Sequence, residues 1–445
     1  MKPPAMDDSG GSLAPLLPKR SPLPLTREKP ASAVGAVFNV STSIIGAGIM
    51  SIPATLKVLG VVPAFIAVAM VALLVDVSVD FMMRFTYSGE SSTYAGLMSE
   101  SFGRLGSIAV QICVMITNLG GLIIYLIIIG DVLSGNQPEG SVHLGVLQEW
   151  FGVHWWNTRA VALLCVVVFV MLPLVLFRRV ESLRFSSAVS VLLAIVFVVV
   201  CFVMAMSALI QGKTESIRLL PQLDNQACFF NLFTAVPVIV TAFTFHFNVH
   251  PIGMELGKPA VMEKAVRISL VLCALIYLAV GIFGYLLFGD AIMADILVNF
   301  DRSSDSAVGK LLNDVVRLSY ALHLMLVFPL INFSLRGNLD EFLFPNKPPL
   351  ATNAERFLSL TLILLVFTYL AAIAIPNIWY FFQLMGSTSA VCLAFIFPGA
   401  VVLRDVHGIS TTKDRILATT MVVLAVITSI IAISTNIYNF TGNKT

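Results

Sequence analysis

The chain has 445 residues, of which 58% are hydrophobic and only 12% are charged, and its mean hydropathy is +0.91. A soluble protein carries about 25% charged residues, so this composition predicts an integral membrane protein. The formal net charge of +2 is too small to indicate a nucleic-acid partner. The six cysteines show no CxxC spacing, and GxSxG, HExxH and P-loop motifs are missing. We therefore expect no metal site, no cofactor and no enzyme activity.

Residues 1–30 are polar and rich in Pro, Ser and Gly, which predicts a disordered cytosolic tail. Beyond it, apolar runs of roughly 20 residues recur, and this length crosses a bilayer as a helix. We expect an all-α protein that contacts membrane lipid through eleven transmembrane helices. These lie near 31–54, 58–83, 107–133, 159–177, 186–211, 230–251, 267–288, 312–335, 357–375, 378–402 and 415–437.

Lys and Arg are distributed unequally between the two sets of loops. If the N-terminus is cytosolic, the tail and the loops on that side hold 19 of the 27 Lys and Arg residues, against 8 on the other side. Cytosolic loops are enriched in Lys and Arg. The bias therefore predicts a cytosolic N-terminus and, with an odd number of spans, a lumenal or extracellular C-terminus.

The first span contains residues that a simple lipid-crossing helix would avoid. Gly46 and Gly48 flank Ala47, and Pro53 follows, although Gly and Pro both weaken helices. Interrupted helices with free N–H and C=O groups bind charged substrates in many transporters. We therefore expect Gly46, Ala47 and Gly48 to bind a substrate carboxylate at a helix N-terminus. Close helix packing through small residues is the alternative.

The sixth span predicts a second interruption. His246, Asn248 and His250 stand within it, and a proline and a glycine follow. Carbonyl groups freed in the first and sixth spans would then be available to a substrate. Because the two spans are five apart, we expect a ten-helix core over 31–403. Its repeats would cover about 31–211 and 230–403, and 404–445 would form an eleventh helix and a short lumenal tail.

Further polar side chains stand inside the spans, where such groups are functional candidates by default. Asn118 and Tyr125, for example, lie two turns apart on one face of the third span. Histidine titrates near neutral pH and could carry a coupling proton. The alternatives are interhelical hydrogen bonds and neutral histidines bonded to freed carbonyls. We expect substrate contacts from Ser43, Asn118, Tyr125, Thr244 and His246, and ion or proton coupling through Asn39, His250 and His323.

Four short segments within or next to the predicted spans resemble, in chain order, the corresponding helices of one known family. They are residues 37–41 with 45–49 in the first span, Asn118-Leu119-Gly120 in the third, His250-Pro251 after the sixth and Val316-Arg317-Leu318 in the eighth. The chain is similar to the amino acid/auxin permease family, in particular its sodium-coupled neutral amino acid transporter branch and the plant vacuolar amino acid transporter group.

The resemblance implies a LeuT-like inverted repeat with helices 1 and 6 broken, and coupled movement of amino acids by alternating access. It also implies that Asn39 stands where sodium-coupled members use an asparagine for the ion. The partner position on the eighth helix holds Met325, whose side chain cannot ligate a hard cation. We therefore expect proton-linked or sodium-independent transport, in an endomembrane such as the vacuolar membrane. An amino-acid sensor without net transport and a sodium-coupled symporter are the alternatives.

Overall fold

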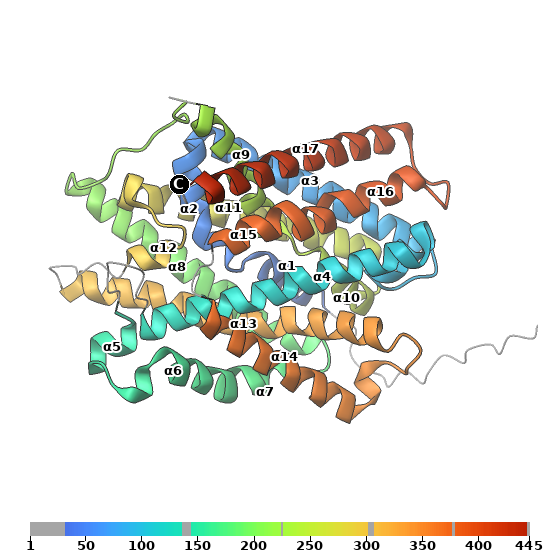
Figure 1. Cartoon of the computed structure of the whole chain (residues 1–445), viewed down its shortest axis with the longest axis horizontal. Helices are drawn as coiled ribbons and strands as arrows, with labels where there is room; N and C mark the ends of the chain where they lie inside the picture. The colour runs from blue at the N-terminus through green and yellow to red at the C-terminus, as the bar shows by residue number, and fades with distance from the viewer. Residues whose placement is uncertain (1–31, 136–143, 224–225, 301–306, 376–378, 443–445) are drawn as a thin grey trace, which may run out of the picture. The chain divides into compact units, whose positions relative to one another are not determined.

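The computed structural model of the chain describes residues 32–135, 144–223, 226–300, 307–375 and 379–442. The expected tail over 1–30 and the last residues, 443–445, lie outside these ranges. The described part is built from helices, and no strand occurs in it (Figure 1). The prediction of an all-α protein is thus confirmed.

The helices follow one another in chain order. The first half contains α1 (Ala33–Ile44), α2 (Gly48–Leu59), α3 (Val61–Ser88), α4 (Tyr94–Ser134), α5 (Val146–Phe151), η1 (Trp155–Asn157), α6 (Arg159–Val166), η2 (Val167–Met171), α7 (Leu172–Val175), η3 (Glu181–Leu183) and α8 (Arg184–Ile210). The second half contains α9 (Gln226–Phe243), α10 (His246–Leu256), α11 (Pro259–Phe288), η4 (Gly289–Ala291), α12 (Ile296–Asn299), α13 (Ala307–Leu343), η5 (Leu350–Thr352), α14 (Ala354–Ala374), α15 (Trp379–Met385), η6 (Gly386–Ala390), η7 (Cys392–Ile396), α16 (Phe397–Arg404) and α17 (Thr412–Gly442).

Length and composition identify the helices that can cross a bilayer. Within the described ranges there are nine, or ten if α1 and α2 count as one bent span. The expected fourth span corresponds to a shorter apolar stretch, Arg159–Val175, in which α6, η2 and α7 follow one another without a gap. A total of eleven spans therefore stays a prediction.

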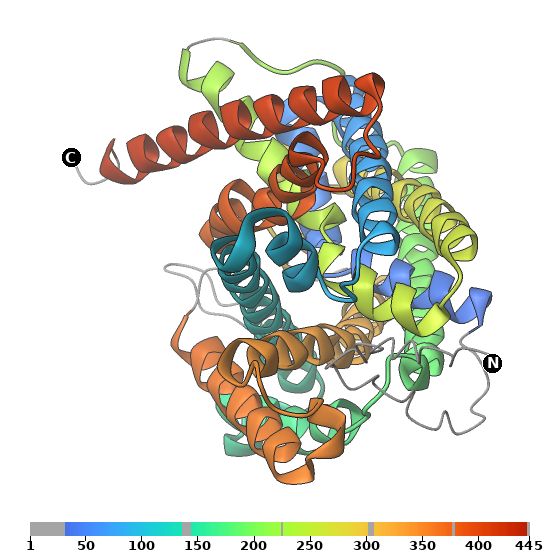
Figure 2. The ribbon, with the colours of Figure 1, turned by 90° about the vertical axis from the view of Figure 1, so that its right-hand side faces the viewer.

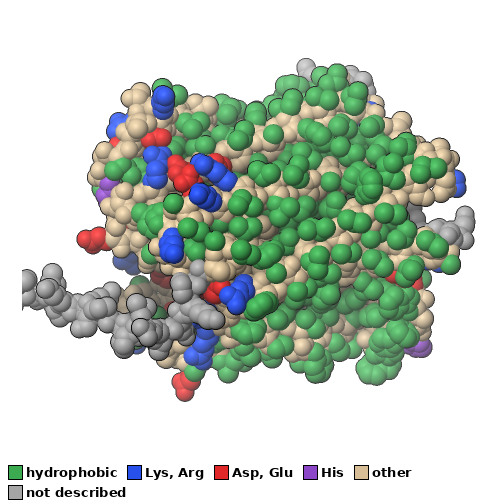
Figure 3. Space-filling view, turned by 180° about the vertical axis from the view of Figure 1, so that it is seen from behind, with side chains coloured by type: hydrophobic (Ala, Val, Ile, Leu, Met, Phe, Trp, Pro, Cys, Tyr) green, Lys and Arg blue, Asp and Glu red, His purple; other side chains and the backbone are tan. Residues whose placement is uncertain are grey.

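The surface fits a bilayer environment. Hydrophobic side chains cover most of the face shown in Figure 3, and charged side chains gather near its ends. Both ribbon views place α17 along one side of the bundle and α14 along the opposite side (Figures 1 and 2).

The first and sixth spans are both interrupted, as predicted. Helix α1 ends at Ile44, α2 begins at Gly48, and the two helices are bent by 54°. The sixth span breaks between α9 and α10, at Thr244 and Phe245. Helix α1 packs against α8, α10 and α11, and α2 packs against α9 and α11. The two broken helices therefore lie inside the bundle, where irregular backbone can be shielded from lipid.

Candidate functional site

A cavity of about 50 Å³ lies where the two interrupted helices meet. Its lining comes from both breaks and from α4, α13 and α15, and none of the lining residues carries a formal charge. The polar character of the cavity therefore depends on backbone groups, hydroxyls and one amide. Seven of the eight expected substrate-binding residues line it: Ser43, Gly46, Ala47, Gly48, Asn118, Tyr125 and Thr244.

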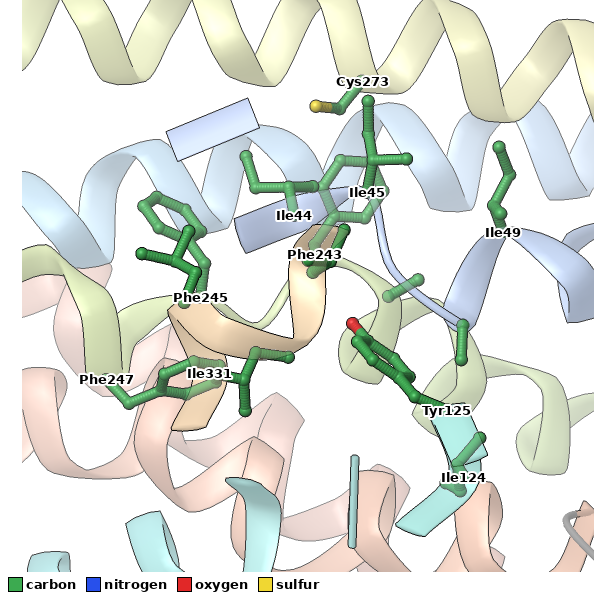
Figure 4. Close-up of a cluster of buried hydrophobic side chains, with 14 of the residues drawn as sticks. Ile44, Ile45, Ile49, Ile124, Tyr125, Phe243, Phe245, Phe247, Cys273 and Ile331 are labelled. Carbon is green, nitrogen blue, oxygen red and sulfur yellow. The ribbon is translucent and has the colours of Figure 1, made fainter. Parts of the chain in front are cut away.

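Tyr125 reaches from α4 to the break between α1 and α2 (Figure 4). Its hydroxyl interacts with the backbone of Ala47. A Cβ atom at Gly46 would lie only 2.0 Å from this hydroxyl, and a Cβ at Gly48 would lie 2.7 Å from the Cα of Ala242 in α9. Gly46 thus leaves room for a tyrosine hydroxyl, whereas Gly48 allows two helices to approach closely.

Three aromatic side chains bond the carbonyls at the end of α1. The Tyr277 hydroxyl of α11 lies 2.6 Å from the carbonyl oxygen of Ile44 and 2.8 Å from that of Ala242, so one residue joins both broken helices. From α13, Tyr320 donates to the carbonyl of Gly46, and His323 Nε2 lies 3.0 Å from the carbonyl oxygen of Ile45. A side chain of this protein therefore lies within hydrogen-bond distance of each carbonyl from Ile44 to Gly46.

Asn118 presents an unpaired amide to the cavity. Its side chain is buried, with 1% exposed, and neither its Nδ2 nor its Oδ1 atom has a hydrogen-bond partner among the described residues. A buried amide without partners costs free energy, about 1–3 kcal/mol. Nearby, Asn248 Nδ2 donates to Ser43 Oγ at 3.0 Å, which ties α10 to α1. Asn118 is therefore the lining side chain best able to bond a ligand.

Two of the expected histidines lie away from the cavity. His246 was expected to contact substrate, but it does not line the cavity, and its Nε2 lies 2.8 Å from Ser78 Oγ of α3. The break falls just before His246, so this residue starts α10 and faces α3. His250 is one turn further along, with Nε2 2.8 Å from Thr86 Oγ1 and its ring stacked on Tyr94.

The other two residues expected to take part in coupling, Asn39 and His323, lie near the break between α1 and α2. Asn39, in α1, donates from Nδ2 to the carbonyl oxygen of Val180 at 3.4 Å, and its buried Oδ1 has no partner in the described ranges. His323 lies between two carbonyls, because its Nδ1 is 2.7 Å from the Ser190 oxygen of α8 and its Nε2 faces Ile45. His323 therefore links the break to α8, whereas Asn39 lies one turn before the cavity.

A second space of about 260 Å³ lies on the α10 side of the cavity. His250, Ser334 and Glu341 are among the residues that line it. Phe247 lines both this space and the central cavity. The aromatic ring of Phe247 therefore separates the two spaces.

Three residues at the site were not predicted from the sequence: Tyr277, Tyr320 and Phe247. Tyr277 and Tyr320 are fully buried, and buried polar groups within apolar runs are informative. A search for every tyrosine inside a predicted span would have found both. No local signal distinguishes Phe247 from the other phenylalanines, because its position between two spaces depends on packing.

Comparison with known proteins identifies the family. Residues 29–439 match the family described as "Transmembrane amino acid transporter protein". The chain belongs to this family. Amino acid transporter AVT6C of Arabidopsis thaliana is 63% identical over 428 residues, which are 96% of this chain and 98% of that protein. Amino acid transporter AVT6A of the same plant is 48% identical over 92% of this chain and 89% of that protein.

A more distant relative is sodium-coupled neutral amino acid transporter 7 of Danio rerio, 24% identical over 84% of this chain and 79% of that protein. These matches confirm the family resemblance predicted from the sequence. The protein is a secondary transporter of amino acids, not an enzyme.

Solved structures share the fold at low sequence identity. A mutant of the manganese transporter of Eremococcus coleocola has a TM-score of 0.63 at 14% identity, over 93% of this chain and 88% of that chain. A Na⁺-coupled sialic acid symporter has a TM-score of 0.52 at 13% identity, over 89% of each chain. The transporter therefore has the LeuT-like fold that was predicted, and these similarities carry no information on its substrate.

Proposed function

We propose that the transporter binds an amino acid zwitterion in the central cavity and moves it by alternating access. Helix α2 begins with Gly48 at this cavity, and the start of a helix carries partial positive charge. The next two N–H groups, of Ile49 and Met50, already donate to the carbonyls of Gly46 and Ala47. The observation that carries the proposal is the unpaired, buried amide of Asn118 in the same lining. The substrate carboxylate bonds the start of α2 and Asn118, whereas His246 has no part in this site.

Transport is sodium-independent in this proposal. A sodium ion takes oxygen ligands, but Tyr320 already donates to the Gly46 carbonyl, and Tyr277 and His323 lie within hydrogen-bond distance of the carbonyls of Ile44 and Ile45. These contacts restrict the amino group of the substrate to the remaining lone pairs of the Ile44 and Ile45 oxygens, because the Gly46 oxygen accepts from both Tyr320 and the Ile49 N–H. This supports the sequence-based expectation, which started from the apolar Met325.

A proton on His323 is the proposed coupling element. A neutral imidazole donates one hydrogen bond, whereas the imidazolium donates two. Only the charged ring can therefore donate to the carbonyls of both Ser190 and Ile45, which lie 2.7 and 3.0 Å from its nitrogens. Protonation would strengthen the link between α8 and the break, and loss of the proton would weaken it.

The membrane and the orientation are further parts of the proposal. The resemblance to the plant vacuolar group supports the vacuolar membrane, and the Lys and Arg bias supports a cytosolic N-terminus. The α10 end of the bundle then faces the cytosol, and the α12 end faces the lumen.

Uptake of labelled amino acids into proteoliposomes tests the proposal. With pH and sodium gradients varied separately, we expect saturable uptake that responds to pH and not to sodium. Gly46→Ala should reduce uptake at least tenfold, because its Cβ would overlap the Tyr125 hydroxyl. Gly337→Ala, where a Cβ meets nothing within 4 Å, is the control. Binding without counterflow, or normal uptake by Gly46→Ala, would contradict the proposed site.

A further inference from the structure

A buried carboxyl group lies outside the central site, in the segment that joins α11 to α13. Asp295 precedes α12, and its Oδ1 accepts a hydrogen bond from the Leu297 N–H at 2.9 Å. Only 6% of the residue is exposed, and no ion pair to it occurs among the described residues. Burying a carboxylate without a cationic partner is costly. The capping bond gives one oxygen of Asp295 a hydrogen-bond partner, but it does not explain why the whole carboxyl group is buried.

The segment around Asp295 is docked on the half-helix that starts at the cavity. Helix α12 packs against α2 and α4. Ser51 of α2, itself fully buried, donates from Oγ to the Ala294 carbonyl at 2.8 Å, and Lys57 Nζ lies 3.4 Å from the Ile292 carbonyl oxygen. This docked segment, residues 289–299, covers the α12 end of α2. It must move if the cavity is to open at that end.

Charged and titratable groups from several elements surround the segment. Lys57 of α2 bonds a backbone carbonyl, and Arg218 pairs with Asp290 at the exposed edge. Asp131 of α4, paired with Arg159 of α6, acts on Asp295 through its negative charge, and Tyr320 of α13 lies within its electrostatic reach. The cations at the segment are therefore bonded to other groups, and the negative charge of Asp131 disfavours a second negative charge on Asp295.

We propose that Asp295 is a proton-binding site that controls docking of segment 289–299 on α2, so that protonation closes the α12 end of the transporter. The proposal rests on alternating access as described above. A neutral carboxyl group is compatible with the buried, docked position, whereas a carboxylate favours release of the segment into water. Acidic solution on the α12 side then favours the state that opens toward α10.

The acid–base properties of Asp295 agree with this role. Burial raises its pKa to about 7, with an opposing contribution from the Leu297 hydrogen bond and a further increase from the Asp131 charge. In the released segment the pKa would return toward its ordinary value, about 3.9. At a pH between these two values, the docked form therefore holds a proton on Asp295 and the released form does not. The stabilisation of the docked form by this proton is complete at low pH and is lost as the pH rises through about 7.

Thiol labelling of Ser51→Cys, in a variant whose native cysteines are replaced, tests this without using transport. Ser51 lies beneath the segment, so an impermeant thiol reagent reaches the introduced thiol only after release. The labelling rate is divided by that of the same protein carrying Asp295→Asn. This ratio should rise by up to about tenfold per pH unit between pH 5 and 7 and then level off. Asn is neutral and retains the capping bond, so Asp295→Asn should stay closed at every pH.

Asp290→Asn is the matched control, because Asp290 is exposed on the same segment and should leave the pH profile unchanged. Identical profiles with and without Asp295→Asn would overturn the proposal. If that variant fails to accumulate, Asp131→Asn should move the level-off point to lower pH, and an unchanged point would overturn the proposal equally. A wild type that shows this labelling pattern but no uptake would refute the proposed function alone.

Discussion

At the scale of single residues, the two glycines of the first break are required for different reasons. A side chain at Gly46 would overlap the hydroxyl of Tyr125, whereas a side chain at Gly48 would overlap the backbone of Ala242. The sequence pattern suggested one shared role in substrate binding, with close packing as the alternative. Gly48 fits the alternative of close packing, because it lets α2 approach α9, although it also lines the cavity.

Tyr320→Phe tests whether the carbonyls of the break need their side-chain partners. Removing the hydroxyl leaves the Gly46 carbonyl with only the 3.3 Å hydrogen bond from the Ile49 N–H, so the lost bond should cost about 0.5–1.5 kcal/mol. We expect a lower thermal midpoint in detergent and slower amino acid uptake. Tyr369→Phe is the control, since that exposed hydroxyl bonds the Ala160 carbonyl far from the break in sequence. Equal behaviour of the two variants would show that the bond at Gly46 is unimportant.

At the scale of helices, the two interruptions form one structural unit. Tyr277 bonds the ends of α1 and α9, and Asn248 of α10 bonds Ser43 of α1. A displacement of one broken helix is therefore transmitted to the other. Phe247, at the start of α10, separates the central cavity from the wider space next to it.

Phe247→Ala should join these two spaces. Removing the ring opens the central cavity toward the α10 end, so efflux of preloaded labelled substrate should be several-fold faster than in the wild type. The loss of a buried ring should also lower stability, by up to about 3–5 kcal/mol. Phe333→Ala removes a ring that lines only the wider space, and it serves as the control. Unchanged efflux from Phe247→Ala would exclude this ring as the barrier.

At the scale of the whole molecule, the apolar surface and the helix ends define two opposite faces. The start of α3 bonds the 213–220 segment through Val61, and the end of α3 bonds Asp414 through Arg84. Lys213 and Lys413, both exposed, therefore mark opposite ends of one long helix.

Single cysteines at these two positions report the orientation. In intact vacuoles, whose membrane is the proposed location, an impermeant thiol reagent should label Lys413→Cys and not Lys213→Cys. The reason is that the proposed orientation, based on the Lys and Arg bias, has the α10 end in the cytosol. Permeabilised vacuoles, in which both should react, provide the control. The reverse pattern would invert the proposed topology.

The amino-acid sequence by itself determined the class, the positions of most membrane-spanning helices and the positions of both breaks. Long apolar runs leave few alternatives to membrane helices, and glycine, proline and polar residues within such runs mark where a helix is interrupted. These signals are local, so Gly46, Asn118 and Tyr125 could be found without coordinates.

Only the tertiary structure decided which polar groups meet. Helical periodicity fixes the relative directions of side chains on one helix, but not which neighbour that helix faces. His246 was therefore predicted to contact substrate in the same way as Thr244, yet it faces Ser78 of α3. The bonds from Tyr277 and Tyr320 and the burial of Asp295 join segments distant in sequence. Such contacts depend on how all the helices pack together, and no single stretch of sequence encodes them.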